Sequence, residues 1–200
     1  GAGAGASADS EPASSTSPLR LVTVAMMRPG DKLASYQLLG AALARLLDLD
    51  WSLEAVGDGP AREAVHEALA PLGDRVAYAG ALGEAAIAAR LAAADLFVWP
   101  AINEAFGMAL LEAQASGLPV VAGKSGGVGD VIADGVTGLL TPPGDAAALA
   151  AAVRALLADP ARRAAMGAAA RDKVRREHDL PAAAARLGEI VAALTPVRAA

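Results

Sequence analysis

The sequence predicts an α/β fold in which about six parallel strands form one doubly wound sheet with helices on both faces. Short apolar runs alternate with longer helical segments along the chain, which is the order produced when crossover helices join parallel strands. The length of 200 residues suffices for one domain with a well-buried core. No run of 18 uninterrupted apolar residues occurs, so no membrane-spanning segment is expected.

Strands are expected at the short apolar runs, of which residues 96–99 are the clearest because Pro100 stops the run Leu-Phe-Val-Trp. The six runs cover residues 19–26, 51–56, 76–79, 96–99, 119–122 and 137–140. Helices are expected in the gaps and after the last strand, at residues 34–47, 60–69, 84–93, 107–116, 128–133, 145–158, 160–175 and 181–194. The helix at 107–116 is expected to be amphipathic.

Residues 1–18 form a separate zone rich in Gly, Ala and Ser. They contain neither Lys nor Arg and no compact apolar segment, so they do not resemble a secretory signal. A flexible linker or tail explains this composition. The folded domain is therefore expected at residues 19–195, followed by a short tail at residues 196–200.

The charge pattern bears on possible partners. A net charge of -5 argues against a general nucleic-acid-binding protein. Nine of the seventeen Lys and Arg residues nevertheless fall at or after Arg154, and a basic helix face can meet an anionic membrane surface. The interleaved Asp172 and Glu177 favour the alternative, an ordinary solvated helix.

The absence of cysteine excludes disulfides, thiolate catalysis and cysteine-based metal sites. His66 and His178 each lack a suitably spaced set of His, Asp or Glu partners, so a solvated or capping role explains them best. We therefore expect no metal site.

The best indication of function is the pair Glu104 and Glu112, which lie eight residues apart across an expected strand, loop and helix junction. On one continuous helix this spacing would rotate the side chains by roughly 80°, so they would not share a face. A loop Glu104 and a helical Glu112 can still converge on one molecule, and the free N–H groups of the helix start suit a phosphate. This combination indicates a nucleotide-sugar site. For an isolated pair, helix capping and solvation would be the simpler explanation.

Two cations follow the first strand, in the segment Arg28-Pro29-Gly30-Asp31-Lys32. In doubly wound sheets, ligands bind beyond the carboxyl ends of the strands. Arg28 can grip phosphate oxygens in a bidentate way and Lys32 adds a mobile point charge, which suits a diphosphate. Taken alone, each is better explained as a surface cation.

Two other phosphate-binding motifs are absent. The first strand is not followed by G-x-G-x-x-G, and the turn at residues 57–60 comes after the second strand instead. No P-loop occurs either. Gly126 and Gly127 open the short helix that begins at Val128, so they offer either a second set of free N–H groups or merely a tight connection.

The segment at residues 100–121, which contains both glutamates, resembles a motif of the retaining glycosyltransferases of family 4, whose GT-B architecture has two Rossmann-like domains. Residues 126–132 and 134–140 strengthen the resemblance, which covers the chain from about residue 19 to residue 194. In that family these segments belong to the C-terminal, donor-binding domain. The resemblance implies one Rossmann-like half of an enzyme that moves a hexosyl group from a nucleoside diphosphate sugar to an acceptor hydroxyl.

The resemblance implies a catalytic role for three residues. Arg28 and Lys32 would contact the diphosphate of the donor, although the loop between them is about one residue shorter than in the family. Glu104 would bind the donor sugar and stabilise a cationic sugar centre. The reaction would retain the anomeric configuration, and the leaving phosphate would help to deprotonate the incoming hydroxyl, so neither a metal nor a cofactor is expected.

A second set of residues is expected to bind the donor. Glu112 would bind the ribose, the helix start would bind the diphosphate, and the loop after the third strand would meet the base. The set comprises Leu82, Phe106, Gly107, Met108, Ala109, Glu112 and Gly127. Tyr78 is open to two interpretations, stacking on the base or packing, and the residues do not distinguish UDP-linked from GDP-linked donors.

The sequence departs from the family pattern at three places. Ala101 stands where relatives commonly have Ser, Ala105 replaces a frequent Gly, and Gly129-Asp130 replaces a common Pro-Glu. None of these changes removes a charge on which the interpretation depends.

The expected partners are the nucleotide-sugar donor and an N-terminal acceptor-binding domain, without nucleic acid. A cytoplasmic location is expected, at the inner face of the membrane if the acceptor is a lipid, as in the synthesis of cell-envelope polysaccharide. The alternative function is a nucleotide-sugar binding or regulatory module without transfer activity. A pyridoxal-phosphate phosphorylase is not favoured, because no lysine has a suitable context.

Overall fold

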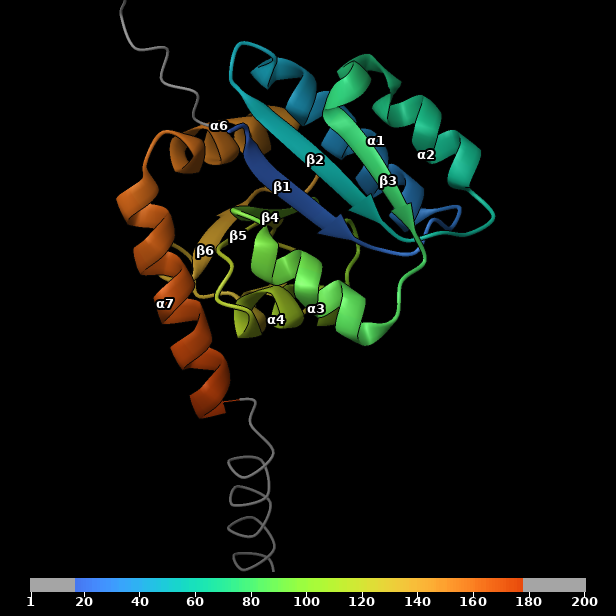
Figure 1. Ribbon diagram of the computed structural model, residues 1–200. Coiled ribbons are helices and arrows are strands. Elements are labelled where there is room, and N and C mark those ends of the chain that lie inside the picture. The colour runs from blue at the N-terminus through green and yellow to red at the C-terminus, as the bar shows by residue number, and fades with distance from the viewer. Residues whose placement is uncertain (1–16, 178–200) are drawn as a thin grey trace, which may run out of the picture.

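The computed structural model describes residues 17–177 (Figure 1). The helix expected at residues 181–194 and the tail at residues 196–200 lie outside the described residues. So does most of the tail expected at residues 1–18.

Within this range the chain forms one six-stranded sheet, and every pair of neighbouring strands is parallel. The strands are β1 (Leu19–Val24), β2 (Trp51–Val56), β3 (Val76–Gly80), β4 (Leu96–Trp99), β5 (Val120–Gly123) and β6 (Gly138–Thr141). Their order is β3-β2-β1-β4-β5-β6, so successive strands extend in one direction from β1 and then in the other from β4. The predicted doubly wound sheet is confirmed, and its topological switch point lies between β1 and β4.

Helices cover both faces of the sheet (Figure 1). They are α1 (Asp31–Leu43), α2 (Arg62–Leu69), α3 (Glu84–Ala93), α4 (Met108–Ala115), the single turn α5 (Val128–Val131), α6 (Ala146–Leu157) and α7 (Pro160–Glu177). Short 3-10 segments η1 (Ala44–Leu46) and η2 (Ala70–Arg75) follow α1 and α2. Helix α1 contacts α2 and α6 on one face, α3 contacts α4 on the other, and α7 packs along α4 and α6.

The core lies where helices cover both faces of the central strands. All four residues of β4 are buried, as are the four of β5. This explains the continuous apolar runs, because a parallel strand that is covered on both sides has no polar face.

The structure changes some expected boundaries. The first helix begins at Asp31 rather than residue 34, and its last turn tightens into η1. The expectation of an amphipathic helix at residues 107–116 is wrong, because the apolar Met108 is 59% exposed while the polar Gln114 is fully buried. Helix α4 is packed against several elements, so its burial does not follow one apolar stripe.

Candidate functional site

A cavity of about 350 Å³ opens at the switch point, beside the carboxyl ends of β1 and β4. Ligands of doubly wound sheets bind at this position. Its walls are formed by the end of β1 and the segment after it, the start of α1, the last residue of β4, the loop before α4 and the first turn of α4. The lining residues are Val24, Ala25, Met26, Lys32, Trp99, Glu104, Ala105, Phe106, Gly107, Met108, Ala109 and Leu110.

Glu104 and Lys32 meet inside this cavity. The Oε2 atom of Glu104 lies 2.5 Å from Nζ of Lys32 and accepts a second hydrogen bond, at 3.3 Å, from Nε1 of Trp99. The Lys32 ammonium also lies 5.5 Å from the centre of a Trp99 ring. The two charged side chains are 17% and 30% exposed, so their pairing is only partly screened by water.

The loop that carries Glu104 has an unusual backbone. Ala101 and Asn103 adopt positive φ angles of 55° and 50°, and Gly107 follows with a φ of 85°. Positive φ costs energy for residues with a Cβ atom, so the surrounding structure must impose this conformation. An added Cβ atom at Gly107 would also lie 2.7 Å from Cδ1 of the buried Leu110, whose side chain would have to shift.

Side chains from α1 and from the loop after β5 hold this turn. Ser35 Oγ accepts a 3.0 Å hydrogen bond from the N–H of Ile102, and Asp31 Oδ2 accepts one at 3.0 Å from Nδ2 of Asn103. Ser125 Oγ accepts a 3.1 Å bond from the N–H of Glu104 and donates to the carbonyl of Ala101.

Sequence reasoning missed these supporting residues. Ser35 lies 67 residues from Ile102, and Ser125 lies 21 residues from Glu104, the residues whose N–H groups donate to them. Neither serine is part of a recognised sequence motif. Asp31 stood within the segment after the first strand, but nothing in that segment linked it to Asn103. The position of Ser125 directly before Gly126-Gly127 was the only available signal, since those glycines marked a tight connection.

The start of α4 offers hydrogen-bond donors to the cavity. The N–H groups of Leu110 and Leu111 both bond to the carbonyl of Gly107. Met108 and Ala109 precede them in the first turn, where a helix supplies no acceptor, and no side chain caps this end. These N–H groups and the helix dipole together favour an anion.

The N–H of Gly127, a residue placed in the expected donor-binding set, is not a free donor. Its N–H donates to the carbonyl of Ala105 at 2.9 Å, and the N–H of Val128 donates to the carbonyl of Ser125 at 3.0 Å. The loops before α4 and before α5 pack so closely that a Cβ atom at Gly127 would lie 2.7 Å from the Ala105 carbonyl oxygen. The glycine pair therefore forms a tight connection, and the N–H groups of Gly127 and Val128 are bonded within the protein.

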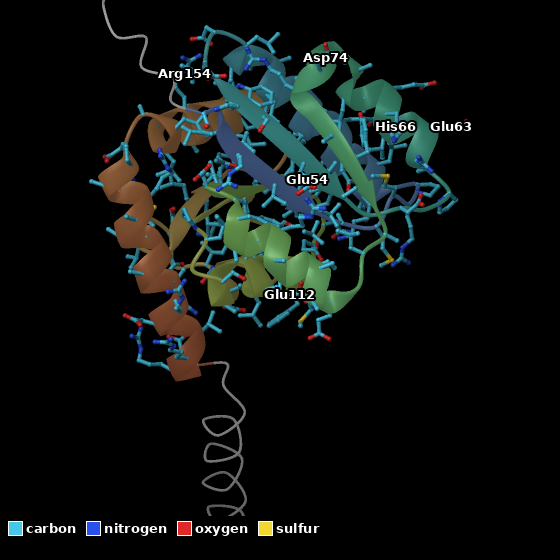
Figure 2. The ribbon with its side chains drawn as sticks, viewed as in Figure 1. Glu54, Glu63, His66, Asp74, Glu112 and Arg154 are labelled. Atoms are coloured by element: carbon cyan, nitrogen blue, oxygen red, sulfur yellow. The ribbon has the colours of Figure 1, made fainter. Side chains whose placement is uncertain are left out.

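Glu112 lines a separate cavity of about 450 Å³ between α3 and α4 (Figure 2). The other lining residues are Glu84, Ile87, Ala88, Leu91, Ala115 and Ser116. Partial burial, and secondarily the negative charge of Glu84, raise the pKa of Glu112 above its usual value. Met108, which lines the first cavity, stands one helical turn before Glu112, which lines the second, so α4 contributes to both cavities.

Arg28, Leu82 and Tyr78 occupy less direct positions. Arg28 is exposed, and its Nη2 atom lies 3.1 Å from Sδ of Met26, which lines the first cavity. Leu82 is partly buried and packs on the core rather than lining either cavity. The ring of Tyr78 stacks on His66 with 3.8 Å between centroids, so its packing role is the one observed.

The basic residues of α7 bind the ends of other helices. Arg163 donates to the carbonyls of Leu156 and Leu157 at the end of α6. Arg171 donates to the carbonyl of Ser116 at the end of α4, and Lys173 to that of Asp130 in α5. These contacts suit the negative ends of helix dipoles and give much of the basic face a structural role.

Within residues 17–177, no three His, Asp or Glu side chains gather as a metal site requires. In the same range, no helix has the length and apolar character needed to cross a membrane.

Comparison with known proteins identifies the family. The family model described as "Glycosyl transferases group 1" matches residues 11–173. The chain belongs to this family.

Curated relatives of this group 1 chain are glycosyltransferases. Over 99 residues it is 40% identical to 2-deoxystreptamine N-acetyl-D-glucosaminyltransferase of Streptomyces fradiae. This match covers 48% of the chain and 24% of the relative. Over 91 residues it is 43% identical to the GDP-mannose-dependent alpha-mannosyltransferase of Corynebacterium glutamicum, a match that covers 46% of this chain and 21% of the relative. The matched part is thus about a quarter of these relatives.

Solved structures share the fold of this group 1 domain. Sucrose-phosphate synthase from Thermosynechococcus elongatus superposes with a TM-score of 0.77 at 32% identity, covering 88% of this chain and 45% of that one. The Anabaena protein HepE in complex with UDP-glucose gives 0.76 at 26% identity, covering 88% and 49%. The parallel sheet is therefore that of a Rossmann-like domain of GT-B glycosyltransferases, and the chain spans about half of these structures.

Proposed function

We propose that this chain is the donor-binding domain of a retaining glycosyltransferase, which transfers a sugar from a nucleoside diphosphate sugar to an acceptor hydroxyl. One observation carries the proposal. The cavity at the switch point joins the uncapped start of α4 to a lysine and a carboxylate, Lys32 and Glu104. Donors for a diphosphate and an acceptor for sugar hydroxyls thus face the same space.

The two cavities, both lined in part by α4, suit the two ends of such a donor. The sugar would lie against Glu104, and the diphosphate against the N–H groups of Met108 and Ala109. The ribose would extend to Glu112 in the second cavity, with the base towards the loop of Leu82. On binding, Arg28 would turn from Met26 to the phosphates, since its exposed guanidinium is free to move.

The proposed reaction breaks the bond between the anomeric carbon and the phosphate oxygen and forms one from that carbon to the acceptor oxygen. Lys32, Arg28 and the start of α4 would stabilise the charge that grows on the leaving diphosphate. Glu104 would stabilise positive charge on the sugar. A phosphate oxygen would take the proton of the acceptor hydroxyl, on the same face of the sugar, which gives retention.

Relatives and exposed surface support this proposal. The relatives include a GDP-mannose-dependent enzyme, and a structural neighbour holds UDP-glucose. Met26, Phe106 and Met108 expose 52%, 40% and 59% of their surface around the first cavity. Such an apolar rim suits cover by a second domain, to which we assign the acceptor site.

Calorimetry of this chain with UDP, GDP and ADP tests donor binding. At least one nucleotide should bind more tightly than millimolar. Glu112→Ala and Arg28→Ala should each weaken that binding about tenfold, the loss expected for one hydrogen bond to a charged group. Glu63→Ala on the outer surface of α2 is the matched control and should leave it unchanged (Figure 2). Binding no tighter than millimolar for all three would contradict the proposal.

A second assay separates the transferase from a binding or regulatory module. Full-length protein should transfer sugar from the nucleotide-sugar that binds, and Glu104→Ala should greatly reduce the rate without unfolding the protein. Tight donor binding by full-length protein without transfer would favour the module instead.

A further inference from the structure

We propose that Ser35 and Ser125 are positioning residues for Glu104, which fix the turn at residues 101–104 so that the carboxylate faces the donor sugar. This inference rests on the proposed function, because it concerns the sugar-binding part of the same site. Neither serine lines the first cavity, so both would act through Glu104.

The turn needs external support because its backbone is strained. Ala101 and Asn103 both have positive φ angles, which residues with a side chain rarely adopt. Two such residues within three positions would relax in an isolated peptide. The direction of the Glu104 side chain therefore depends on the groups that hold the turn in place.

Ser35 holds the middle of the turn from α1. Its side chain is fully buried, and its hydroxyl accepts from the N–H of Ile102 at 3.0 Å while donating to the carbonyl of Asp31 at 2.8 Å. Both hydrogen-bonding functions of the hydroxyl are used, so the oxygen has one fixed position. Ile102 lies between the two strained residues, and its backbone is tied to the same helix that carries Lys32.

Ser125 holds the two ends of the turn together from the loop after β5. Its hydroxyl accepts from the N–H of Glu104 and donates to the carbonyl of Ala101. The backbone of Glu104 is thereby fixed to a loop that packs closely against it, because Gly126 and Gly127 have no Cβ atoms to separate them. With its backbone fixed, the Glu104 carboxylate reaches both Lys32 and the indole of Trp99.

This arrangement gives a readout that a general loss of stability would not produce. A free nucleoside diphosphate lacks the donor sugar that would contact Glu104, whereas the nucleotide-sugar carries it. The ratio of the affinity for the nucleotide-sugar to the affinity for the nucleoside diphosphate therefore reports on the groups that contact the donor sugar, Glu104 among them. Loss of either serine should lower this ratio and leave the affinity for the nucleoside diphosphate nearly unchanged.

The experiment measures the affinities of UDP, UDP-glucose, GDP and GDP-mannose by calorimetry on this chain, and uses the pair that binds. Ser35→Ala and Ser125→Ala should each lower the ratio about fivefold to tenfold, as expected for one or two lost hydrogen bonds. Ser125→Thr keeps the hydroxyl, so this variant should show the wild-type ratio. Ser52→Ala, beside a different cavity with Arg20 and Arg90, is the control and should not change it.

Double variants decide whether the serines act through Glu104. In a Glu104→Ala background, Ser125→Ala should have no further effect on the ratio. Equal additional losses in both backgrounds would overturn the proposal, as would single serine variants with the wild-type ratio. Thermal unfolding checks each variant, and if Ser35→Ala does not fold, the Ser125 series decides alone.

The outcomes also separate this inference from the proposed function. If wild-type protein binds none of the four ligands, the proposed function fails. If it binds them and Glu104→Ala lowers the ratio while Ser125→Ala does not, only the positioning role fails. If the wild-type chain binds the nucleotide-sugar and the free nucleoside diphosphate with equal affinity, Glu104 does not bind the donor sugar. The positioning role then fails as well.

Discussion

Lys32 and Glu104 lie 72 residues apart in the sequence and form an ion pair, with 2.5 Å between Nζ and Oε2, at the switch point of the sheet. Each residue was expected to bind a different part of one donor, the diphosphate and the sugar. In the protein alone they neutralise each other. Under the proposed function, donor binding redistributes their contacts.

Removal of Glu104 should release Lys32 for the diphosphate. We expect Glu104→Ala to bind the free nucleoside diphosphate about threefold more tightly than wild type, the magnitude of one partly exposed ion pair. The same variant should lose transfer. Calorimetry with the nucleoside diphosphate measures the effect, and Glu63→Ala controls for the change in net charge. Weaker binding by Glu104→Ala would show that the pair does not compete with the ligand.

Binding of the nucleotide-sugar should depend on pH through Glu112. Burial and the charge of Glu84 raise the pKa of Glu112 above its ordinary value of 4.5, so this carboxyl gains its proton at a higher pH than a solvated glutamate. Ribose hydroxyls donate to the ionised form. Affinity should therefore be full at neutral pH and begin to fall, as pH is lowered, before pH 4.5 is reached.

The matched variants for this pH effect are Glu112→Gln and Glu84→Gln. The first should remove the decline, and the second should move it to lower pH because one cause of the raised pKa is lost. The nucleotide-sugar is the suitable ligand, because the terminal phosphate of a free nucleoside diphosphate would itself titrate at about pH 6. An unchanged pH profile in Glu112→Gln would assign the titration to another group.

Gly107 should be intolerant of a side chain. Gly107→Ala combines a φ of 85° with a 2.7 Å approach to Leu110, so we expect a loss of about 2 to 4 kcal/mol in the free energy of unfolding. Gly135→Ala is the control, since its φ of 75° is similar but no atom lies within 4 Å. It should cost only about 1 kcal/mol. Denaturant unfolding measures both, and equal losses would remove the packing argument.

Lys173 should stabilise the short helix α5. Its side chain is 11% exposed, and its ammonium donates to the Asp130 carbonyl at 2.9 Å and to Oε2 of Glu177 at 2.6 Å. Lys173→Met keeps the apolar stem and removes these bonds, so the free energy of unfolding should fall by about 1 to 3 kcal/mol. Arg176→Ala, exposed on the same helix, should change stability by less than about 0.5 kcal/mol.

The predictable part of the fold came from local patterns. Buried parallel strands must be apolar throughout, so runs such as Leu96–Trp99 were visible without the structure. Because parallel strands end at one edge of the sheet, residues that follow β1 and β4 were expected to lie together. Lys32 and Glu104 do so. Arg28 does not line the cavity with them, because its exposed side chain turns to Met26 instead.

The sequence by itself determined the doubly wound sheet, the edge at which we propose that the donor binds and the two glutamates proposed to contact it. Only the tertiary structure decided how the site is divided and supported. It placed Glu104 and Glu112 in separate cavities that α4 helps to line, bonded the N–H of Gly127 to the carbonyl of Ala105, and tied the Glu104 turn to Ser35 and Ser125. The reason is physical: apolar periodicity reports which residues are buried, whereas hydrogen bonds between distant loops depend on how the packed elements meet.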